Sequence, residues 1–599
     1  MVLERKDIDP KYKWDLSAIY ADEAAFDADY AKAEKRIRAY ASHESTMNTS
    51  PEALYAALKE KYAISDLLGK LWQFASLNAC VDLADSTAQA RQTRVKNLYT
   101  LLGETAWFMS TRILSLGDET LNEWMESHPP LAEFRRVLES YMRWRPHLLS
   151  DECEKLRADM SDALDTHTNI YTLLTDADMR FGFIRGEDGE RAELTDTNFP
   201  LFVKSPVRRV RRAAFVSIYK TYAQFKNTVA ALYEARVKEA VVSAKVRRYP
   251  DSLTASTDGD EITPEIYNNL IASVRRGLPV LYDYYEMKRE ILGLAKMHLY
   301  DVYVPLVGAY DRKYTYEEAI DEVLKTVSVF GDEYAETLKE GLLSRGWVDV
   351  YPNRGKRGGA FSSSSALTEP YVLMNFEEHL DDVSTLAHEA GHSMHAWYSK
   401  NANPTQNSHP TLFVAEVAST VNELLLAHRK LAESGSREER LYVLNRLLET
   451  YKATLYRQTM FAEFERDMHA LEAKGEPLTA DRISKHYFEL VKLYFGDGVV
   501  CDEGIAYEWM RIPHFYRCFY VYKYATCISA ASTIVKRIET EGAPYIRKYL
   551  DFLRCGSAKS PLDSLLVADV DMRKPEVVEN AIADFAETLR QFKELYFQK

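Results

Sequence analysis

Four residues able to do metal or acid–base chemistry stand close together in the segment LAHEAGHSMH, at positions 386 to 395: His388, Glu389, His392 and His395. Apolar residues recur there at spacings of three and four, which predicts an amphipathic helix. Residues four apart lie on one face of a helix, so the imidazoles of His388 and His392 can bind one zinc ion together. Glu389 directly follows the first ligand and would face a water on that ion.

An HExxH pair needs a third ligand to form a catalytic zinc site. The metzincin pattern would place a histidine at position 398, where this chain has Tyr398. A second segment with helical spacing, at 408 to 431, carries Glu416 among apolar neighbours, and a carboxylate buried there is costly unless a cation pairs with it. The sequence therefore predicts a zinc site made of His388, His392 and Glu416, with a fourth position open for water.

Two further side chains would lie beside this site. Glu423 stands seven residues after Glu416 on the same expected helix face, where it could accept a hydrogen bond from the second nitrogen of a ligating imidazole. An exposed helix glutamate is the alternative for Glu423. His395 would close the site if it were a fourth ligand, so we expect it to support the ligands or to lie on the substrate side.

Helical spacing of apolar residues dominates the chain and predicts a mainly α-helical protein. The segment MRFGFIRGEDGERAELT, at 179 to 195, instead alternates and contains the pair Asp188-Gly189, which is typical of a hairpin turn between two strands. We place a boundary there. It gives an N-terminal helical lobe at 1–195 and a catalytic lobe with the zinc site at 196–599.

Two β-like runs around a glycine- and serine-rich connection, between 347 and 376, predict a small sheet directly before the histidine helix. An edge strand of that sheet could pair with an extended peptide, and Gly358 and Gly359 would let the two backbones approach. An ordinary flexible turn is the alternative for these glycines. Another alternating run, LYDVYVPL at 299 to 306, predicts a short strand or extended segment that ends at Pro305.

The chain carries a formal net charge of −14, which argues against nonspecific binding to a phosphate backbone. Its one pronounced basic run, KSPVRRVRRAAF at 204 to 215, is typical of a solvated helix face. We find no signal-peptide pattern and no apolar run of about 18 residues, and the six cysteines lack CxxC spacing. We therefore expect a cytoplasmic protein with no nucleic-acid or membrane partner and no obligate protein partner.

Several separated motifs occur in a fixed order: GKRGGAF, PYVLMNF, LAHEAGHSMHAWYS, FVAEVASTVNE and EWMRIPHFYRCFYVYKYAT. Over most of its length the chain resembles the M3 family of zinc metallopeptidases, in the oligoendopeptidase F branch. The resemblance implies a mainly helical protein of two lobes that enclose a deep substrate channel. It implies one zinc ion per chain on His388, His392 and Glu416, with Glu389 as the general base, and cleavage of internal bonds in short unfolded oligopeptides.

The resemblance also implies that a histidine and tyrosines near the C-terminal end bind substrate and stabilise the oxyanion. The matching segment here holds His514, Tyr516, Tyr520, Tyr522 and Tyr524. We assign oxyanion stabilisation to His514 and Tyr522, and substrate binding to Tyr516 and Tyr520. The spacing from the histidine to the tyrosines differs from that of the thimet oligopeptidase branch, so which tyrosine faces the metal stays open.

Two other functions compete with an endopeptidase. One is an exopeptidase such as a peptidyl dipeptidase or a zinc carboxypeptidase, which needs a fixed cation for the terminal carboxylate of its substrate. Arg511 and Lys523 are candidates because they lie near the tyrosines. A non-catalytic peptide-binding protein with a structural zinc is the other. Such a protein would be expected to have lost the base or a ligand, yet Glu389, both histidines and Glu416 are all present.

Overall fold

A computed structural model of the chain describes residues 3–308 and 310–598. Its internal contacts divide the chain into two compact units, each assembled from separate stretches. Unit 1 comprises Met1–Pro146, Asp311–Arg429 and Ile534–Val570, and unit 2 comprises His147–Tyr310, Lys430–Thr533 and Asp571–Lys599. The division of the sequence into two continuous lobes, 1–195 and 196–599, stays a prediction.

Helices make up most of unit 1, as the apolar spacing predicted, and short strands complete it. Its helices are α1 (Glu23–Tyr40), α2 (Pro51–Val81), α3 (Ser86–Thr105), α4 (Met109–Ser115), α5 (Asp118–Ser127), α6 (Arg135–Trp144), α15 (Tyr316–Val327), α16 (Asp332–Leu343), α17 (Leu380–Ala402), α23 (Ala543–Leu553) and α24 (Pro561–Val567). Its strands are β4 (Val348–Asp349), β5 (Phe361–Ser363) and β6 (Tyr371–Leu373). Two helices belong to both units, α18 (Ala415–Glu433) and α22 (Tyr522–Glu541).

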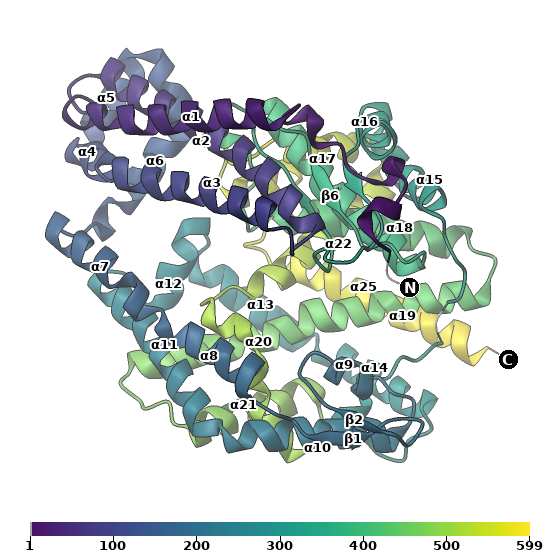
Figure 1. The fold of residues 1–599 in the computed structure, drawn as a ribbon. Coiled ribbons are helices and arrows are strands. Elements are labelled where there is room, and N and C mark those ends of the chain that lie inside the picture. Colours follow the sequence, from purple (N-terminus) through teal and green to yellow (C-terminus); the bar gives the residue numbers. More distant parts are fainter. Residues whose placement is uncertain (1–2, 309, 599) are drawn as a thin grey trace. The chain divides into compact units, whose positions relative to one another are not determined.

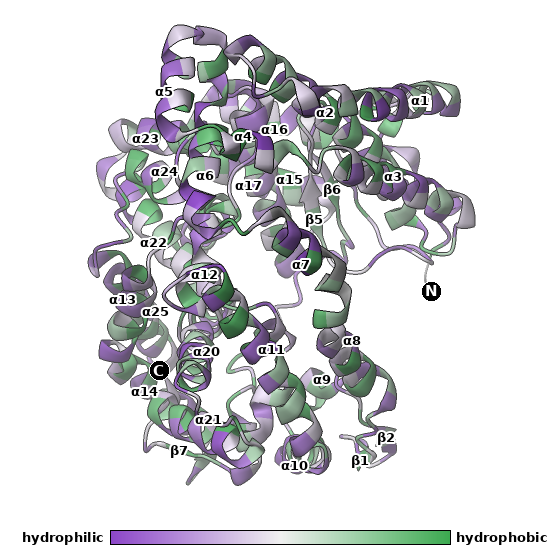
Figure 2. Ribbon diagram, turned by 90° about the vertical axis from the view of Figure 1, so that its left-hand side faces the viewer, coloured by the Kyte–Doolittle hydropathy of each residue, from purple (hydrophilic) through white to green (hydrophobic). Residues whose placement is uncertain are grey.

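The N-terminal helices α1, α2 and α3 pack side by side (Figure 1). The Ser50 hydroxyl accepts a hydrogen bond from the Ala53 N–H at 3.2 Å, and Pro51 occupies the first turn, so α2 has a favourable start. Hydrophilic and hydrophobic residues occur along the same helices (Figure 2), as amphipathic packing requires. The core of these helices includes Tyr371 and Leu373 of β6, so they support the sheet.

β4, β6 and β5 form, in that order, the small sheet that the sequence predicted before the histidine helix. β4 pairs with β6 in parallel, and β5 pairs with β6 antiparallel, with Phe361 opposite Leu373. β5 is therefore an edge strand, and it contacts α17. The hydroxyl oxygens of Ser362 on β5 and Ser393 on α17 lie 2.9 Å apart, which fixes the strand against that helix.

Unit 2 is also mainly helical. Its helices are α7 (Asp151–Leu164), α8 (Thr166–Thr172), α9 (Phe199–Val203), α10 (Arg208–Gln224), α11 (Lys226–Val246), α12 (Ser252–Thr257), α13 (Pro264–Arg276), α14 (Leu278–Ile291), α19 (Arg437–Tyr451), α20 (Gln458–Ala473), α21 (Ala480–Phe495) and α25 (Glu576–Phe597). Its strands are β1 (Phe183–Arg185), β2 (Arg191–Glu193), β3 (Met297–His298) and β7 (Val499–Val500). Among the described residues, no helix is both long and apolar enough to cross a membrane.

The predicted hairpin at 179–195 is confirmed. β1 and β2 pair antiparallel, with Phe183 opposite Glu193, and Gly189 has a φ of +86° in the turn. The Asp188 carboxylate accepts a hydrogen bond from the Glu190 N–H at 2.8 Å, which closes the turn locally.

The prediction of a strand or extended segment at 299 to 306 is wrong. The chain instead forms a 3-10 turn at Leu299–Asp301, directly after β3. Asp301 is fully buried, and its carboxylate accepts a hydrogen bond from the His298 N–H at 3.0 Å. It also forms ion pairs of 2.8 Å with Arg208 and with Arg211. Leu299, Tyr300 and Val302 beside it are all buried as well, so the apolar residues of this run pack into the core without forming a strand.

The basic run at the start of α10 is only partly solvated, which corrects the expectation of a solvated helix face. Arg211 is buried against Asp301, and Arg209 donates to the carbonyl oxygen of Gly186 in the β1–β2 turn at 2.9 Å. These arginines therefore hold elements of unit 2 together.

Candidate active site

The helix α17 carries His388, Glu389 and His392 on a rigid and well-capped frame. Its start is a capping box, in which the Asp382 carboxylate accepts the His379 N–H at 2.9 Å. Leu386, Ala390 and Met394 are buried on its core side, whereas both histidine side chains keep about a quarter of their surface exposed, at 26% and 22%. The helix thus presents the two imidazoles together at a surface of unit 1.

Glu416 reaches the histidines because α17 and α18 approach unusually closely at Gly391. A Cβ atom at Gly391 would lie 2.6 Å from the Ala418 carbonyl oxygen and 2.6 Å from the Ser419 Cα. Any larger residue would therefore push the helices apart. Glu416 stands in the first turn of α18, and the Ser419 hydroxyl donates to its Oε2 at 3.2 Å.

Three possible ligand atoms meet in a nearly equilateral triangle. The Nε2 atoms of His388 and His392 lie 3.1 Å apart, and the Glu416 Oε2 lies 3.4 Å from the first and 3.3 Å from the second. Ligands held about 2.05 Å from a tetrahedral zinc ion are about 3.3 Å from each other. The donor set and its spacing therefore fit a zinc ion with three protein ligands.

The second nitrogen of His388 is held by Glu423, whose Oε1 accepts a hydrogen bond from His388 Nδ1. Burial opposes the charge on this imidazole, but the hydrogen bonds with Glu416 and Glu423 raise the pKa of His388 to about 10 when no metal is bound. Without a metal, His388 therefore carries a proton on each ring nitrogen at neutral pH. Loss of the Nε2 proton, with the Nδ1 proton held by Glu423, would leave a lone pair directed toward His392 and Glu416.

Sequence reasoning missed two residues that hold the helices in register. Asn422 is fully buried, and its side-chain amide donates to the Ala387 carbonyl oxygen of α17 at 3.1 Å. Gly391 lies inside the motif itself, where the HExxH pattern leaves the residue free. The sequence did contain a signal for each of them. Asparagine and glycine both disfavour a helix interior, so their presence inside two predicted helices indicates that packing requires them.

Glu389 is 5% exposed, and its Oε2 atom has no hydrogen-bond partner among the described residues. Burial raises the pKa of this carboxyl, while the two histidines oppose the rise. An unsatisfied carboxylate oxygen beside two ligating imidazoles is suited to accept a proton from a water placed there.

A cleft of about 470 Å³ in unit 1 opens over these residues. It is lined by the edge strand β5, by α17 and by the start of α18, through Ala360, Phe361, Ser362, Ser364, His388, Glu389, His392, Ala396, His409, Pro410, Ala415 and Glu416. Gly358 and Gly359 directly precede this lining, and Gly359 has a φ of +82°. Their contact with substrate stays a prediction.

His395 lies in the core rather than at the cleft. It is 2% exposed, its ring centroid is 5.3 Å from that of Phe552, and its Nδ1 has no hydrogen-bond partner in the described part of the chain. Burial, with a smaller contribution from His392, lowers the pKa of His395 to about 3, so the ring is neutral. A supporting role through packing fits this position.

The predicted oxyanion and substrate residues His514, Tyr516, Tyr520 and Tyr522 lie in unit 2. The rings of His514 and Tyr520 stack with centroids 6.1 Å apart, and both residues are partly exposed. Tyr516 stacks on Tyr171 at 4.3 Å and is buried. The metal-type residues belong to unit 1, so the meeting of this segment with them stays a prediction.

Tyr522 has no exposed surface, and its ring centroid lies 4.9 Å from that of Tyr267. Tyr524 is partly exposed, and its ring centroid is 6.2 Å from that of His514. Within unit 2, the accessible aromatic surface beside His514 is therefore formed by Tyr520 and Tyr524 rather than by Tyr522.

The two cations that the sequence offered for an exopeptidase are already paired. Arg511 forms an ion pair with Asp196, and Lys523 lies 2.6 Å from the Asp260 carboxylate. Neither guanidinium nor ammonium is thus free to hold a terminal carboxylate of a substrate without giving up its own partner.

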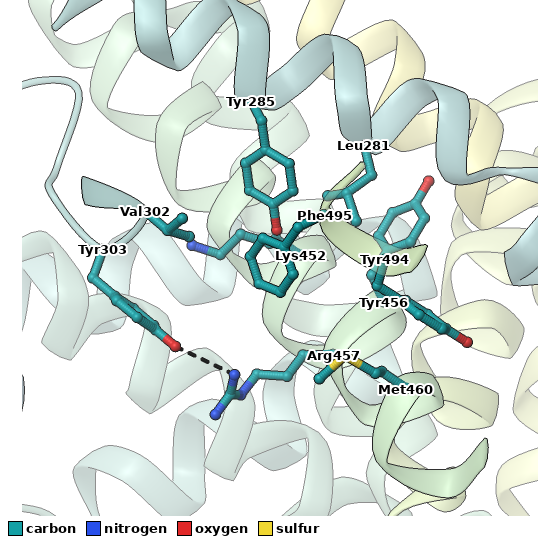
Figure 3. A pocket seen from close by; sticks show the side chains of 10 residues that line it. All are labelled: Leu281, Tyr285, Val302, Tyr303, Lys452, Tyr456, Arg457, Met460, Tyr494 and Phe495. Carbon is teal, nitrogen blue, oxygen red and sulfur yellow. Dashed lines mark hydrogen bonds between the residues drawn. The ribbon is translucent and has the colours of Figure 1, made fainter. Parts of the chain in front are cut away.

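Unit 2 also contains a small cavity of about 30 Å³ beside the π-helical turn Lys452–Arg457 (Figure 3). Tyr285, Phe495 and the stem of Lys452 surround it, and the Tyr303 hydroxyl accepts a hydrogen bond from Arg457 at 3.2 Å. A volume of this size holds a water molecule or two and excludes a peptide.

Known proteins resemble this chain over nearly its whole length. Residues 201–584 match the model of peptidase family M3, and residues 112–181 match the model described as oligopeptidase F. Oligopeptidase PepF of Bacillus subtilis (strain 168) is 38% identical over 592 residues, which cover 99% of this chain and 88% of that protein.

Two solved structures share the fold. A peptidase from Chlamydophila abortus gives a TM-score of 0.93 at 33% identity and covers 99% of this chain and 100% of its own. Oligoendopeptidase-F from Enterococcus faecium gives a TM-score of 0.76 at 30% identity and covers 96% of this chain and 100% of its own. The mainly helical fold and the family resemblance are confirmed. The chain therefore belongs to peptidase family M3, in its oligopeptidase F branch, and is a metallopeptidase.

Proposed function

We propose that the protein is a zinc-dependent endopeptidase that hydrolyses internal bonds of short, unfolded oligopeptides. The observation that carries this proposal is the triangle of His388, His392 and Glu416 at 3.1 to 3.4 Å, with the unpartnered Glu389 carboxylate beside it in an open cleft. The relatives named oligopeptidase and oligoendopeptidase support the substrate class. One zinc ion per chain would occupy this triangle.

The chemistry divides between the ion and the protein. When bound, a zinc ion supplies a Lewis acid that lowers the pKa of a water toward about 7 and polarises a carbonyl group. Glu389 takes the proton of the attacking water on its free oxygen and delivers it to the leaving amine. Glu423 keeps the Nδ1 proton of His388 in place, so the ligand set holds its geometry while Glu389 changes protonation state.

The edge strand β5 is the proposed clamp for the peptide. Its outer side is not paired within the sheet, and Phe361 and Ser362 line the cleft beside the ligands. An extended peptide that adds to this strand would be held by main-chain hydrogen bonds, with Gly358 and Gly359 allowing close approach. Such pairing reads few side chains, so broad sequence specificity is expected.

His514 and the tyrosines Tyr516, Tyr520 and Tyr522 are the proposed donors and contacts from unit 2. A hydroxyl or imidazole donor aimed at the developing oxyanion contributes about 2.7–4 kcal/mol to transition-state stabilisation. The exposure of Tyr520 supports it as a donor beside His514, and the burial of Tyr516 and Tyr522 supports a role in positioning that surface. We further propose a cytoplasmic protein without an obligate protein partner.

The test is cleavage of an internally quenched peptide whose two ends are blocked. Wild-type protein with zinc should cut it internally, because an endopeptidase needs neither terminus. Glu389→Gln should lower kcat by about 10²–10⁴-fold, the contribution of a general base, while zinc content stays unchanged. The matched control is Glu438→Gln on the exposed start of α19, which should retain full activity.

Full activity of Glu389→Gln would exclude this glutamate as the base. Failure to cut the blocked peptide, together with removal of single residues or dipeptides from a free one, would replace the endopeptidase with an exopeptidase. Product masses from a peptide mixture, with and without a chelator, report the cut position and metal dependence in one measurement.

A further inference from the structure

A second group of metal-type side chains lies in unit 2 and shares no residue with the cleft. Glu465 and His469 stand four residues apart on α20 and therefore project from one face of that helix. Cys518 comes from the segment that follows the 3-10 turn Pro513–Tyr516. The candidate ligand atoms of Glu465, His469 and Cys518 all lie within 4.8 Å of one another.

The side chains of Glu465 and His469 are deeply buried, and in each of them one polar atom has a hydrogen-bond partner and the other has none. Glu465 is 0% exposed; its Oε1 accepts the Phe519 N–H at 2.6 Å, but its Oε2 has no hydrogen-bond partner in the described parts of the chain. His469 is 2% exposed; its Nδ1 lies 2.9 Å from the Ser252 hydroxyl, and its Nε2 likewise has no partner there. Native proteins rarely leave such buried atoms unpaired without an ion or a water between them.

The nearby guanidinium of Arg236 does not pair with the unpartnered atoms of Glu465 and His469. Arg236 influences the charge of Glu465, but its guanidinium donates to the Tyr516 carbonyl oxygen at 2.9 Å and pairs with Glu239. Burial raises the pKa of Glu465, which Arg236 only partly offsets, and burial lowers the pKa of His469. A divalent cation with one carboxylate, one thiolate and one neutral imidazole has no net charge, which suits a buried place.

We propose that Glu465, His469 and Cys518 bind a second divalent cation of the zinc type, which ties α20 to the segment that carries His514. Mixed sulfur, nitrogen and oxygen donors favour Zn²⁺ over Mg²⁺ or Ca²⁺, which prefer oxygen alone. In the proposed site, the Ser252 hydroxyl, 2.9 Å from His469 Nδ1, would accept the proton of that nitrogen and leave the Nε2 lone pair for the ion.

The second ion would hold the segment that carries His514 in place and would take no part in peptide hydrolysis itself. Cys518 precedes Phe519, whose φ of +55° is unfavourable for a side chain of this size and whose N–H is held by Glu465. Fastening Cys518 to α20 therefore fixes the strained end of the segment between His514 and Tyr520. Loss of the ion should loosen that segment and leave α17 and α18 unaffected.

Cobalt distinguishes the two sites, because Cys518 supplies sulfur to the proposed second site and the site at α17 has none. Purified full-length protein is stripped of metal, titrated with Co²⁺ and followed in the near ultraviolet for the thiolate-to-cobalt charge-transfer band, with metal content measured in parallel. We expect two Co²⁺ per chain and a charge-transfer band in the wild type. Cys518→Ser should lose the band and one of the two ions.

Matched variants separate this site from other thiols and from the first metal. Cys501→Ser removes another partly buried cysteine of unit 2, whose pKa burial also raises, and should keep the band. His392→Ala, in the first site, should lose the other ion and keep the band, so the two proposals fail independently. Helical circular dichroism confirms that each variant is folded.

Absence of the band in wild-type protein loaded with Co²⁺ overturns the proposal, as does a band that persists in folded Cys518→Ser. A band that survives in both Glu465→Gln and His469→Ala at unchanged Co²⁺ affinity would assign the signal to Cys518 alone and also reject the three-ligand site.

Discussion

At the scale of single residues, the chemistry of the cleft depends on which nitrogen and which oxygen each side chain presents. His388 and His392 present Nε2 atoms 3.1 Å apart because they share one helix face. Glu423 accepts from the other nitrogen of His388 and so decides the tautomer. Glu389, one residue along from a ligand, keeps an oxygen without a partner. The direction in which each side chain points thus distinguishes the proposed ligands from the proposed support and the proposed base.

The role of Glu423 predicts a graded loss of metal affinity. Glu423→Ala removes the acceptor of the His388 Nδ1 proton and should weaken zinc binding about 10–100-fold, whereas Glu423→Gln keeps an acceptor oxygen and should weaken it less. The measurement is the zinc concentration that restores half of the activity in zinc-buffered solution. Glu438→Ala is the control. Equal affinities for the alanine variant and the wild type would show that Glu423 does not orient the ligand.

At the scale of elements, the site depends on how closely two helices approach. α17 supplies two of the proposed ligand atoms and α18 the third, and the two helices meet closely at Gly391 and at the buried Asn422. The sheet adds an edge strand that Ser362 and Ser393 fix beside the same helix. The geometry of the cleft is therefore a property of packing among α17, α18 and β5.

The close contact at Gly391 predicts opposite outcomes for two glycine-to-alanine changes. In Gly391→Ala the new Cβ would overlap α18, so stability should fall by about 1–3 kcal/mol and zinc affinity should fall as Glu416 moves away. In Gly103→Ala, in the last turn of α3, the new Cβ meets no atom within 4 Å, so stability should rise by about 0.5 kcal/mol. Urea unfolding measures both, and a neutral Gly391→Ala would contradict the packing argument.

In unit 2, the buried carboxylate of Asp301 joins α10 to the turn after β3. Burial opposes its ionisation, but hydrogen bonds from Arg208, from the His298 N–H and from Arg211 hold the pKa of Asp301 below its ordinary value. A carboxylate with a depressed pKa stabilises the fold above its unfolded value of about 3.9, and this contribution disappears as the pH falls through the folded pKa.

Asp301→Asn should therefore lower the free energy of unfolding by about 3–5 kcal/mol at pH 7, because Arg211 is left buried without its partner. The difference from the wild type should shrink as the pH falls below about 4. Asp283→Asn, which removes an exposed ion pair with Lys593, is the control and should change stability by about 1 kcal/mol or less. A pH-independent difference between Asp301→Asn and the wild type would rule out the charge as its cause.

At the scale of the whole molecule, each unit combines stretches that lie far apart in the chain, and α18 and α22 belong to both. The proposed metal site nevertheless lies within unit 1, on helices that pack through Gly391 and Asn422. The fold should therefore persist when the metal is absent, in contrast to small domains that need zinc to fold.

Removal of the metal should abolish peptide cleavage while it leaves the helical circular dichroism of the full-length protein nearly unchanged. Added Zn²⁺ should restore activity without refolding, because the ligand atoms already stand at tetrahedral spacing. Activity and circular dichroism are measured on the same chelator-treated sample. A large loss of helix on chelation would mean that the site does not form before the ion binds.

The sequence by itself predicted the helices of the site and the proposed ligands. Helical periodicity predicted α17 and α18, the HExxH spacing placed His388 and His392 on one face, and a carboxylate among apolar neighbours singled out Glu416. These features are local, because residues three and four apart in a helix are neighbours whatever the rest of the chain does. The hairpin with Asp188-Gly189 was predictable for the same reason.

Tertiary structure decided what depends on distant residues. The residues next to Asp301 in the sequence do not indicate that Arg208 and Arg211 of α10 pair with it. These ion pairs stabilise a buried turn where the alternating sequence predicted a strand or extended segment. The close approach at Gly391, the burial of His395 and Tyr522, and the meeting of Cys518 with Glu465 and His469 likewise arise from packing between elements far apart in the chain. Spacing along a helix fixes which side chains share a face, but only the packed molecule determines which faces meet.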